Sequence, residues 1–267
     1  MKKIIYSLLA AATLMSCATS DASNNKVDKD VTITKNLTVK GSFNTIRSCS
    51  NIDIEYTPSS SVSIAATSTS YGLEALNVYV KNNTLYFETQ NDRSTWSKKG
   101  YVIKVKLSAP TVSTYNTSGN SQIKVKGYVA VQGDLTVTTS GNSEVEFKQK
   151  VDCETIRGTS TGNSSIEFDG KAVCSFFDTT SSGNSGISVE ELLCDKAKVR
   201  TSGNSSTDIE INATSLSAQS SGNSEIKVSG KVDSYSVASS GNSGINIKKL
   251  QARNTSVSSS GNSSISR

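Results

Sequence analysis

Residues 182–205 read SGNSGISVEELLCDKAKVRTSGNS, so the motif Ser-Gly-Asn-Ser returns twenty residues after its previous copy. The shorter motif Gly-Asn-Ser occurs eight times at spacings of 19 to 22 residues. A near-constant period of this length, without any helical pattern, predicts one coil of a parallel β-helix per repeat. The glycines of the eight copies are Gly119, Gly141, Gly162, Gly183, Gly203, Gly222, Gly241 and Gly261.

Apolar residues alternate with polar ones inside each repeat. They stand four and six residues after each glycine, as in Ile187 and Val189, and again six and four residues before it. This period of two is typical of strands with one buried face, so each coil has at least two walls. The residues between the apolar positions are expected to face water, among them Lys124, Glu146, Glu167 and Lys227. In the fifth copy Thr207 takes an apolar position, and we expect a weaker spot there.

The motif itself is predicted to be a turn. Glycine and asparagine both tolerate a positive φ, which a strand needs where it bends sharply. Stacked coils would bring the asparagines into one column in which each amide bonds to the next. The alternative is a flat binding strip made by the same side chains. The column contains Asn120, Asn142, Asn163, Asn184, Asn204, Asn223, Asn242 and Asn262.

Cys153, Cys174 and Cys194 follow their glycines by 11 or 12 residues and would stack in consecutive coils. We expect buried free thiols that fill the core. A disulfide between neighbouring coils is the second reading, although three stacked thiols cannot all pair. A metal site is disfavoured because the fourth ligand and Cys-x-x-Cys spacing are missing. Cys49 has no evident partner.

The chain begins with an export signal. Lys2 and Lys3 precede an apolar run, and Leu14-Met15-Ser16-Cys17 resembles a lipobox, in which the cysteine is lipidated and becomes the new amino terminus. The alternative is ordinary secretion, with Cys17 lost or free. Ala18 after the cysteine favours outer-membrane sorting. We therefore predict a lipoprotein signal peptide over 1–17 and a polar tether over 18–30.

Residues 31–115 lack the motif but keep strand patterns, which predicts irregular β coils or a capping sheet before the solenoid of residues 116–267. Asn82-Asn83 favours the turn of a hairpin over 79–86. Trp96 lies in a loop rich in Ser and Lys, and we expect it to pack over a coil rather than to stack on a sugar. The last coil carries no cap sequence, so its edge is expected to self-associate or to dock on a surface partner.

Composition disfavours most enzymes and nucleic-acid binding. The chain has no histidine, and the part after residue 17 has a net charge of +3. Histidine is the commonest general base and metal ligand, and +3 is too weak for a nucleic-acid footprint. Glu146, Glu167 and Asp169 form the best acidic cluster for a carbohydrate-active β-helix enzyme. We expect solvated surface there, and neither catalysis nor a cofactor.

The lipoprotein-like leader, the segment Ser50-Asn51-Ile52-Asp53-Ile54 and the serial Ser-Gly-Asn-Ser coils together resemble the family described as "Putative auto-transporter adhesin, head GIN domain". The resemblance implies an all-β, right-handed, single-chain parallel β-helix and a surface adhesin, and it supplies no catalytic residues. Three functions stay open: an outer-membrane-anchored adhesin for a host or bacterial glycan or protein, an envelope scaffold without a ligand, or a carbohydrate-active enzyme.

Overall fold

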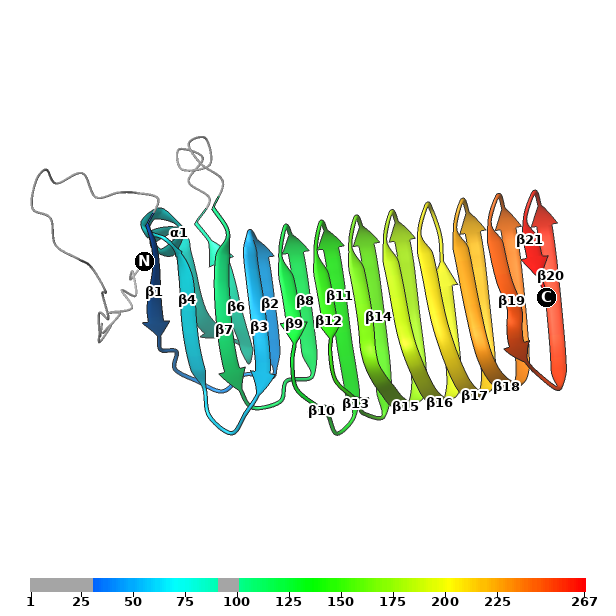
Figure 1. Cartoon of the computed structure of the whole chain (residues 1–267), viewed down its shortest axis with the longest axis horizontal. Coiled ribbons are helices and arrows are strands. Elements are labelled where there is room, and N and C mark those ends of the chain that lie inside the picture. Colours follow the sequence, from blue (N-terminus) through cyan, green and yellow to red (C-terminus); the bar gives the residue numbers. More distant parts are fainter. Residues whose placement is uncertain (1–30, 91–100) are drawn as a thin grey trace, which may run out of the picture.

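The computed structural model describes residues 31–90 and 101–267, which form a solenoid with a sheet at its amino-terminal end (Figure 1). All of its strands belong to one wound sheet of 21 strands, accompanied by one short helix, α1 (Ser70–Ala75). The predicted all-β class and the stacked parallel coils are confirmed. Trp96 and the segments 1–17 and 18–30, with Cys17, lie outside the described residues. Within the described part, no helix is long and apolar enough to cross a bilayer.

Each coil has three sides. The entry wall leads upward into the Gly-Asn turn, the exit wall leads away from it, and the base closes the coil at the bottom of Figure 1. In the first coils these sides are separate strands: β8 (Thr114–Gly119), β11 (Asp134–Gly141) and β14 (Thr155–Gly162) on the entry wall, β9 (Gln122–Val125) and β12 (Glu144–Phe147) on the exit wall, and β10 (Val129–Ala130) and β13 (Val151–Asp152) in the base.

Later coils are single strands that run from one turn, down the exit wall, around the base and up the entry wall to the next turn. These are β15 (Ser165–Gly183), β16 (Gly186–Thr201), β17 (Ser206–Gly222) and β18 (Glu225–Gly241). The last coil is divided again into β19 (Gly244–Gln251), β20 (Asn254–Gly261) and β21 (Ser264–Ser266).

Neighbouring coils pair in parallel with the turn glycines in register, so that Gly162 lies opposite both Gly141 and Gly183. The first difference in repeat length falls between the base and the entry wall, because Val129 pairs with Val151 whereas Asp134 pairs with Thr155. Later differences are accommodated at the corner between the exit wall and the base. The register shifts there between Phe168 and Lys171 and again between Val189 and Leu192. A bulge at this corner absorbs the missing residue, and the walls and the turn keep the same register from coil to coil.

The predicted inward residues form one continuous core. Its amino-terminal half carries a row of buried aromatic rings. Tyr115 meets the edge of Phe147 with 5.1 Å between ring centroids, and Phe147 stacks on Phe168 at 4.8 Å. Rings on adjacent coils thus stabilise the stack in the favoured edge and offset geometries. Thr179 is also inward, as predicted, and is 1% exposed.

The amino-terminal residues contribute more than irregular coils or a cap, because β2 (Thr45–Ser50) and β3 (Ile52–Pro58) form a genuine coil. They pair in parallel with β8 and β9, respectively, although more than sixty residues separate them in sequence. Ser50 lies opposite Gly119 and takes the same positive φ, 75° against 77°. The segment Ser50-Asn51 is therefore a ninth turn, which the missing glycine conceals in the sequence.

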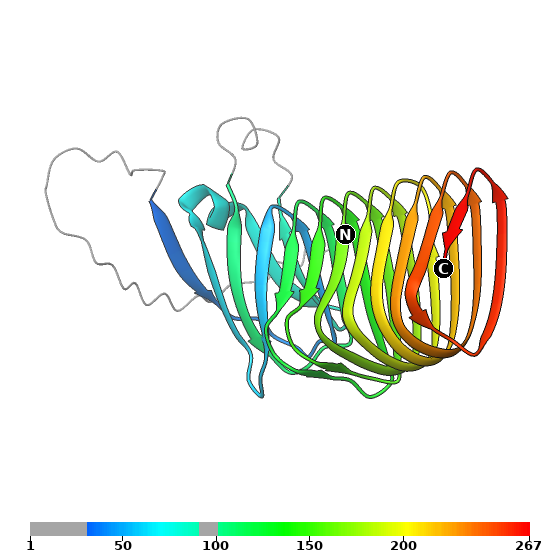
Figure 2. The same ribbon diagram turned by 45° about the vertical axis from the view of Figure 1, so that its right-hand side comes forward.

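The chain between β3 and β8 builds the end sheet (Figure 2). It contains β4 (Ser63–Thr69), β5 (Leu76–Lys81), β6 (Thr84–Thr89) and β7 (Ile103–Ala109), and β1 (Thr32–Leu37) is added at its edge. β7 continues the exit wall and pairs antiparallel with β4, which pairs antiparallel with β1. β5 and β6 form the predicted hairpin, with Asn82 and Asn83 at φ 50° and 57°, which confirms this turn.

Candidate functional site

The asparagines of the turns stack in a column that we call the asparagine ladder. Each Nδ2 donates a hydrogen bond to Oδ1 of the asparagine one coil nearer the amino terminus, at 2.8 to 3.3 Å. The ladder begins at Asn51, before the first Gly-Asn-Ser copy, and its bonds continue through Asn242. Asn51 is half-buried and the other members are exposed, and all are mutually bonded in the order Asn51, Asn120, Asn142, Asn163, Asn184, Asn204, Asn223 and Asn242. Asn262, the last predicted member, forms no such bond within the described part.

The second serine of each motif closes the turn from inside, which the sequence analysis did not anticipate. Ser185 is 3% exposed, and its single hydroxyl proton is shared between the carbonyl of Ser182 at 2.8 Å and that of Ser160 on the preceding coil at 2.9 Å. It also contacts the buried hydroxyl of Ser181 at 2.9 Å. Equivalent bonds recur along the stack, so the serine is required for backbone satisfaction and is not available to a ligand.

Thr207, where we expected a weak spot, belongs to the same seam. It is 1% exposed, and its hydroxyl lies 2.8 Å from that of Thr201 on the preceding entry wall. The polar side chain is therefore satisfied inside the coil. The stability gained from this hydrogen bond offsets at least part of the stability that the other coils gain from an apolar side chain at this position.

The structure places Cys174 opposite Cys194, with Cys153 on the coil before them, and all three are buried free thiols. Burial raises the pKa of the Cys153 thiol to about 12. A hydrogen bond with Cys194, together with burial, raises the pKa of Cys174. Neutral thiols of this kind pack as small apolar groups and are poor nucleophiles and metal ligands. Cys49 is a half-buried free thiol at the edge of the second strand.

Four charged side chains on the exit wall neutralise each other. Lys124 contacts Oε2 of Glu146 at 2.8 Å, and Lys148 bridges Glu146 to Asp169. Glu146 is not solvated as the alternation predicted, because these lysines from the same and neighbouring coils cover it and its residue is 6% exposed. Burial would raise the pKa of Glu146, but hydrogen bonds from the two lysines outweigh it and hold the pKa below its usual range.

Glu146, Glu167 and Asp169 bring one oxygen each within 4.8 Å of one another. Burial and the neighbouring Glu144 raise the pKa of Glu167. A glycosidase pair needs separated carboxylates that face a substrate cleft. Here Lys148 occupies the space between two of the three acids. This geometry favours an internally compensated surface over a catalytic or metal-binding one.

The entry wall differs from the exit wall in that its outward residues are mostly uncharged and hydroxylated. The side chains of Thr136, Thr138, Thr159, Ser217 and Ser236 form no hydrogen bond with other residues of the described part. These groups point outward from a parallel sheet. They are accordingly available to an external partner.

Two surface depressions accompany these features. One, of about 490 Å³, runs beside the asparagine ladder between Asn142 and Asn204. The other, of about 550 Å³, lies low on the entry wall in the carboxy-terminal half, where Phe176 and Lys196 border a floor of serines. Neither was evident from the sequence, because each depends on small residues stacking over three or four coils.

Solved structures of other proteins share this architecture. A crystal structure described as a putative adhesin from Parabacteroides merdae is similar with a TM-score of 0.74 at 16% identity, over 88% of this chain and 96% of that one. A putative adhesin from Parabacteroides distasonis is similar with a TM-score of 0.71 at 17% identity, over 86% and 97%. A structure from the same species described as a putative lipid binding protein gives 0.65 at 17% identity, over 88% and 97%. At these identities the likeness concerns the fold.

No curated protein matches the chain. The sequence model of one family does match it, over residues 42–209 and again over 179–266. The first match begins just before β2 and the second covers the regular coils, so the matched region is the solenoid described above together with most of its end sheet. The chain therefore belongs to the family described as "Putative auto-transporter adhesin, head GIN domain".

Proposed function

We propose that this protein is a non-catalytic adhesin of the bacterial envelope, exported, anchored to the outer membrane by a lipid on Cys17, and binding glycans or proteins through its entry wall. The observation that carries the proposal is the contrast between the two walls. On the exit wall lysines bind two of the three clustered acids, Glu146 and Asp169. On the entry wall several outward hydroxyl groups, such as those of Thr138 and Ser217, have no hydrogen-bond partner within the described part. The family's description as an adhesin supports the same reading.

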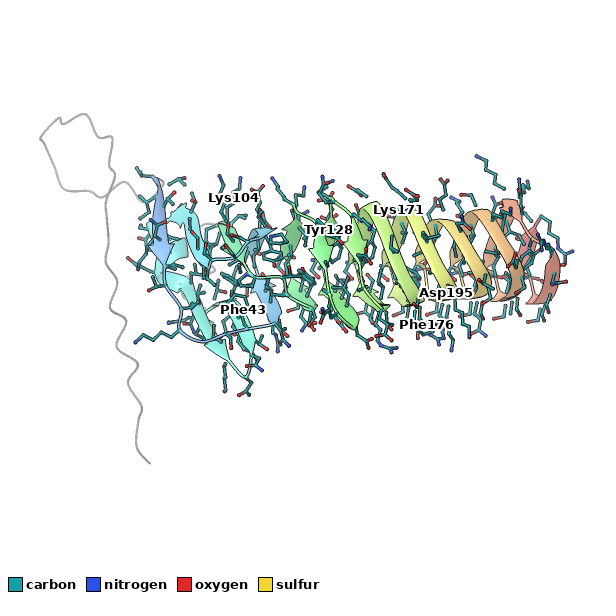
Figure 3. All side chains as sticks on the ribbon, turned by 90° about the horizontal axis from the view of Figure 1, so that it is seen from below. Phe43, Lys104, Tyr128, Lys171, Phe176 and Asp195 are labelled. Carbon is teal, nitrogen blue, oxygen red and sulfur yellow. The ribbon has the colours of Figure 1, made fainter. Side chains whose placement is uncertain are left out.

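The solenoid suits this role because its interior is filled and its outer side chains lie in straight columns (Figure 3). Coils lie about 4.8 Å apart, and the residue directly before each turn glycine is Ser or Thr on every coil, so a repetitive ligand can meet equivalent hydroxyl groups there on successive coils. Many copies on one cell would then convert weak individual contacts into firm attachment.

Binding is tested with purified residues 18–267 on immobilised glycans, mucins and matrix proteins, with heat-unfolded protein as the control. The double variant Thr138→Val/Gln219→Val removes outward polar groups from the entry wall, and Ser188→Val/Ser229→Val makes a matched change on the exit wall. We expect saturable binding that only the entry-wall variant loses. If the folded protein binds no member of the panel, an envelope scaffold is favoured instead.

Anchoring is tested separately in cells. Mass spectrometry of the mature amino terminus should find a diacyl or triacyl cysteine at position 17, and Cys17→Ser should release the protein from the membrane fraction. Recovery of an unmodified terminus from membranes would contradict the lipid anchor without affecting the binding proposal.

A further inference from the structure

The depression on the entry wall is a trough. It forms because the outward side chains at two equivalent positions of each coil become smaller from one coil to the next. Seven and five residues before the turn glycine, the coils ending at Gly222 and Gly241 carry only serine, namely Ser215, Ser217, Ser234 and Ser236. The preceding coils carry larger groups at these places, with Lys196 and Lys198 on one coil and Phe176 and Asp178 on the one before it. The serines thus form a low floor that larger side chains border at one end.

The border is positively charged and uncompensated. Lys196 and Lys198 form no ion pair within the described part of the chain, whereas Lys148 and Lys171 on the exit-wall side are bound to carboxylates. Asp178 lies opposite Lys198 in the strand register, but its ion pair is with Arg200 at 2.9 Å. None of the residues that line the trough is acidic. The site therefore favours an anion at its lysine end.

An aromatic ring lies beside the two lysines. Phe176 is half-buried, and Figure 3 shows it on the opposite side of the solenoid from Lys171, at the foot of the entry wall. A phenyl ring that remains partly exposed offers an apolar surface to the C–H face of a sugar. The trough thus presents an aromatic ring, then two ammonium groups, then a row of hydroxyl groups. An acidic sugar chain carries a complementary group for each of them: a C–H face for the ring, a carboxylate for the lysines and hydroxyls for the serines.

Resting on the proposed adhesin function, we infer that the trough binds a linear acidic glycan containing uronic acid. Its carboxylate pairs with Lys196 and Lys198, one sugar ring packs on Phe176, and the following sugars donate and accept hydrogen bonds along the serine floor. Lys196 is exposed and Lys198 is half-buried, so the charge contribution is screened by salt and a single site binds weakly. Affinity at a cell surface then arises from many copies.

The test is a titration of residues 18–267 with a hexasaccharide of polygalacturonic acid, and with the same hexasaccharide after reduction of its carboxyl groups. We expect the acidic probe to bind and to weaken with added salt, and the reduced probe to bind at least about tenfold less tightly. Lys196→Gln/Lys198→Gln should cause a similar loss. Lys231→Gln/Lys248→Gln removes two lysines without an ion-pair partner in the described part, lowers the net charge equally, and should leave binding unchanged. Phe176→Ser should weaken both probes.

Several outcomes would overturn the inference. Equal binding of both probes excludes recognition of the carboxylate, and equal losses in the two lysine pairs exclude the trough. Binding to phosphatidylglycerol vesicles through Lys196 and Lys198, without binding to the hexasaccharide, would assign the site to a lipid surface. If the protein binds a member of the glycan, mucin and matrix panel but not the acidic hexasaccharide, the trough inference fails and the adhesin proposal stands. If it binds neither the panel nor the hexasaccharide, both the inference and the proposal fail.

Discussion

The side-chain amide of Asn120 donates a hydrogen bond at 3.1 Å to Oδ1 of Asn51, a residue 69 positions earlier in the chain. The backbone pairing of Ser50 with Gly119 lies beside it. Between these two turns the chain leaves the solenoid after β3, builds the end sheet and returns as β8, which pairs with β2 of the coil that it left. The bond therefore extends the asparagine ladder from the repeats into the amino-terminal coil.

The ladder should contribute to stability in proportion to the bonds that each member makes. Asn184 donates to Asn163 and accepts from Asn204, whereas Asn51 only accepts from Asn120. We expect Asn184→Ala to lower the free energy of unfolding by about 1 to 2 kcal/mol and Asn51→Ala by about half as much. Asn212→Ala, at an exposed position in the base, is the control. Thermal unfolding followed by circular dichroism measures all three, and equal effects at Asn184 and Asn212 would show that the ladder adds no stability.

The turn column gives a paired prediction of opposite sign. Ser50 adopts φ 75°, a conformation that costs a residue with a Cβ about 1 kcal/mol or more, so Ser50→Gly should stabilise the protein by up to about 1 kcal/mol. At Gly183 a Cβ would lie 3.0 Å from the backbone N and O of Gly162. Gly183→Ala should therefore destabilise by about 2 kcal/mol or more. Urea unfolding measures both, and a destabilising Ser50→Gly would contradict the equivalence of the two turns.

A buried hydroxyl in the core offers a stabilising substitution. Thr179 Oγ1 has no hydrogen-bond partner among the residues that the structure describes, and the residue stacks between Gly158 and Val199 of the neighbouring coils. Thr179→Val keeps the shape and removes the unsatisfied group, so we expect a gain of about 1 to 2 kcal/mol in the free energy of unfolding. Thr159→Val, with an outward side chain, should change it by less than about 0.5 kcal/mol. Equal effects at the two sites would mean that Thr179 is already satisfied.

The cysteine column should be inert in the native state. With the pKa of Cys153 raised to about 12 by burial, its thiol stays protonated near pH 8, and none of the three core thiols should react with a disulfide reagent until urea unfolds the chain. The unfolded thiol ionises near pH 8.5, so stability falls as pH rises from there toward the folded pKa. Cys153→Ala should make this alkaline loss shallower. A Cys174–Cys194 disulfide found by mass spectrometry would contradict the free-thiol assignment.

The outer edge of the last described coil is the proposed site of self-association. β20 pairs with β18 on one side, and no strand of the described residues pairs with its other side. Val257 is only partly buried there. We expect residues 18–267 to associate at high concentration through this edge, as measured by light scattering, and Val257→Lys to abolish the association because an inward charge opposes edge pairing. Thr138→Lys is the control, and a monomer at every concentration would count against the proposal.

Local chemistry explains why much of the fold was predictable. The glycine period, the inward pairs and the Asn82-Asn83 hairpin each depend on residues close together in sequence. The turn at Ser50 was concealed because serine replaces the glycine and the pairing partner lies 69 residues away. A signal was present nonetheless, since Ile54 and Tyr56 follow Ser50 by four and six residues, the same spacing as in the repeats.

The site was less predictable because it depends on relations between coils. Glu146 reads as an ordinary outward acid, and only the stacking places Lys124 above it and brings Lys148 to it and to Asp169. The trough likewise requires that serines align over several coils beside Lys196 and Phe176. Sequence shows which residues point outward, but the depth and charge of a surface arise from what the neighbouring coils place beside them.

The uniform register of the turns also governs how such a protein can change in evolution. Every ladder bond joins the same donor to the same acceptor, and each corner bulge accommodates a repeat of different length. A whole coil can therefore be duplicated or deleted between two others while the same bonds re-form across the junction. Each event would move the far end by about 4.8 Å and leave the end sheet untouched. Reach can thus be adjusted in small fixed steps by gene duplication alone.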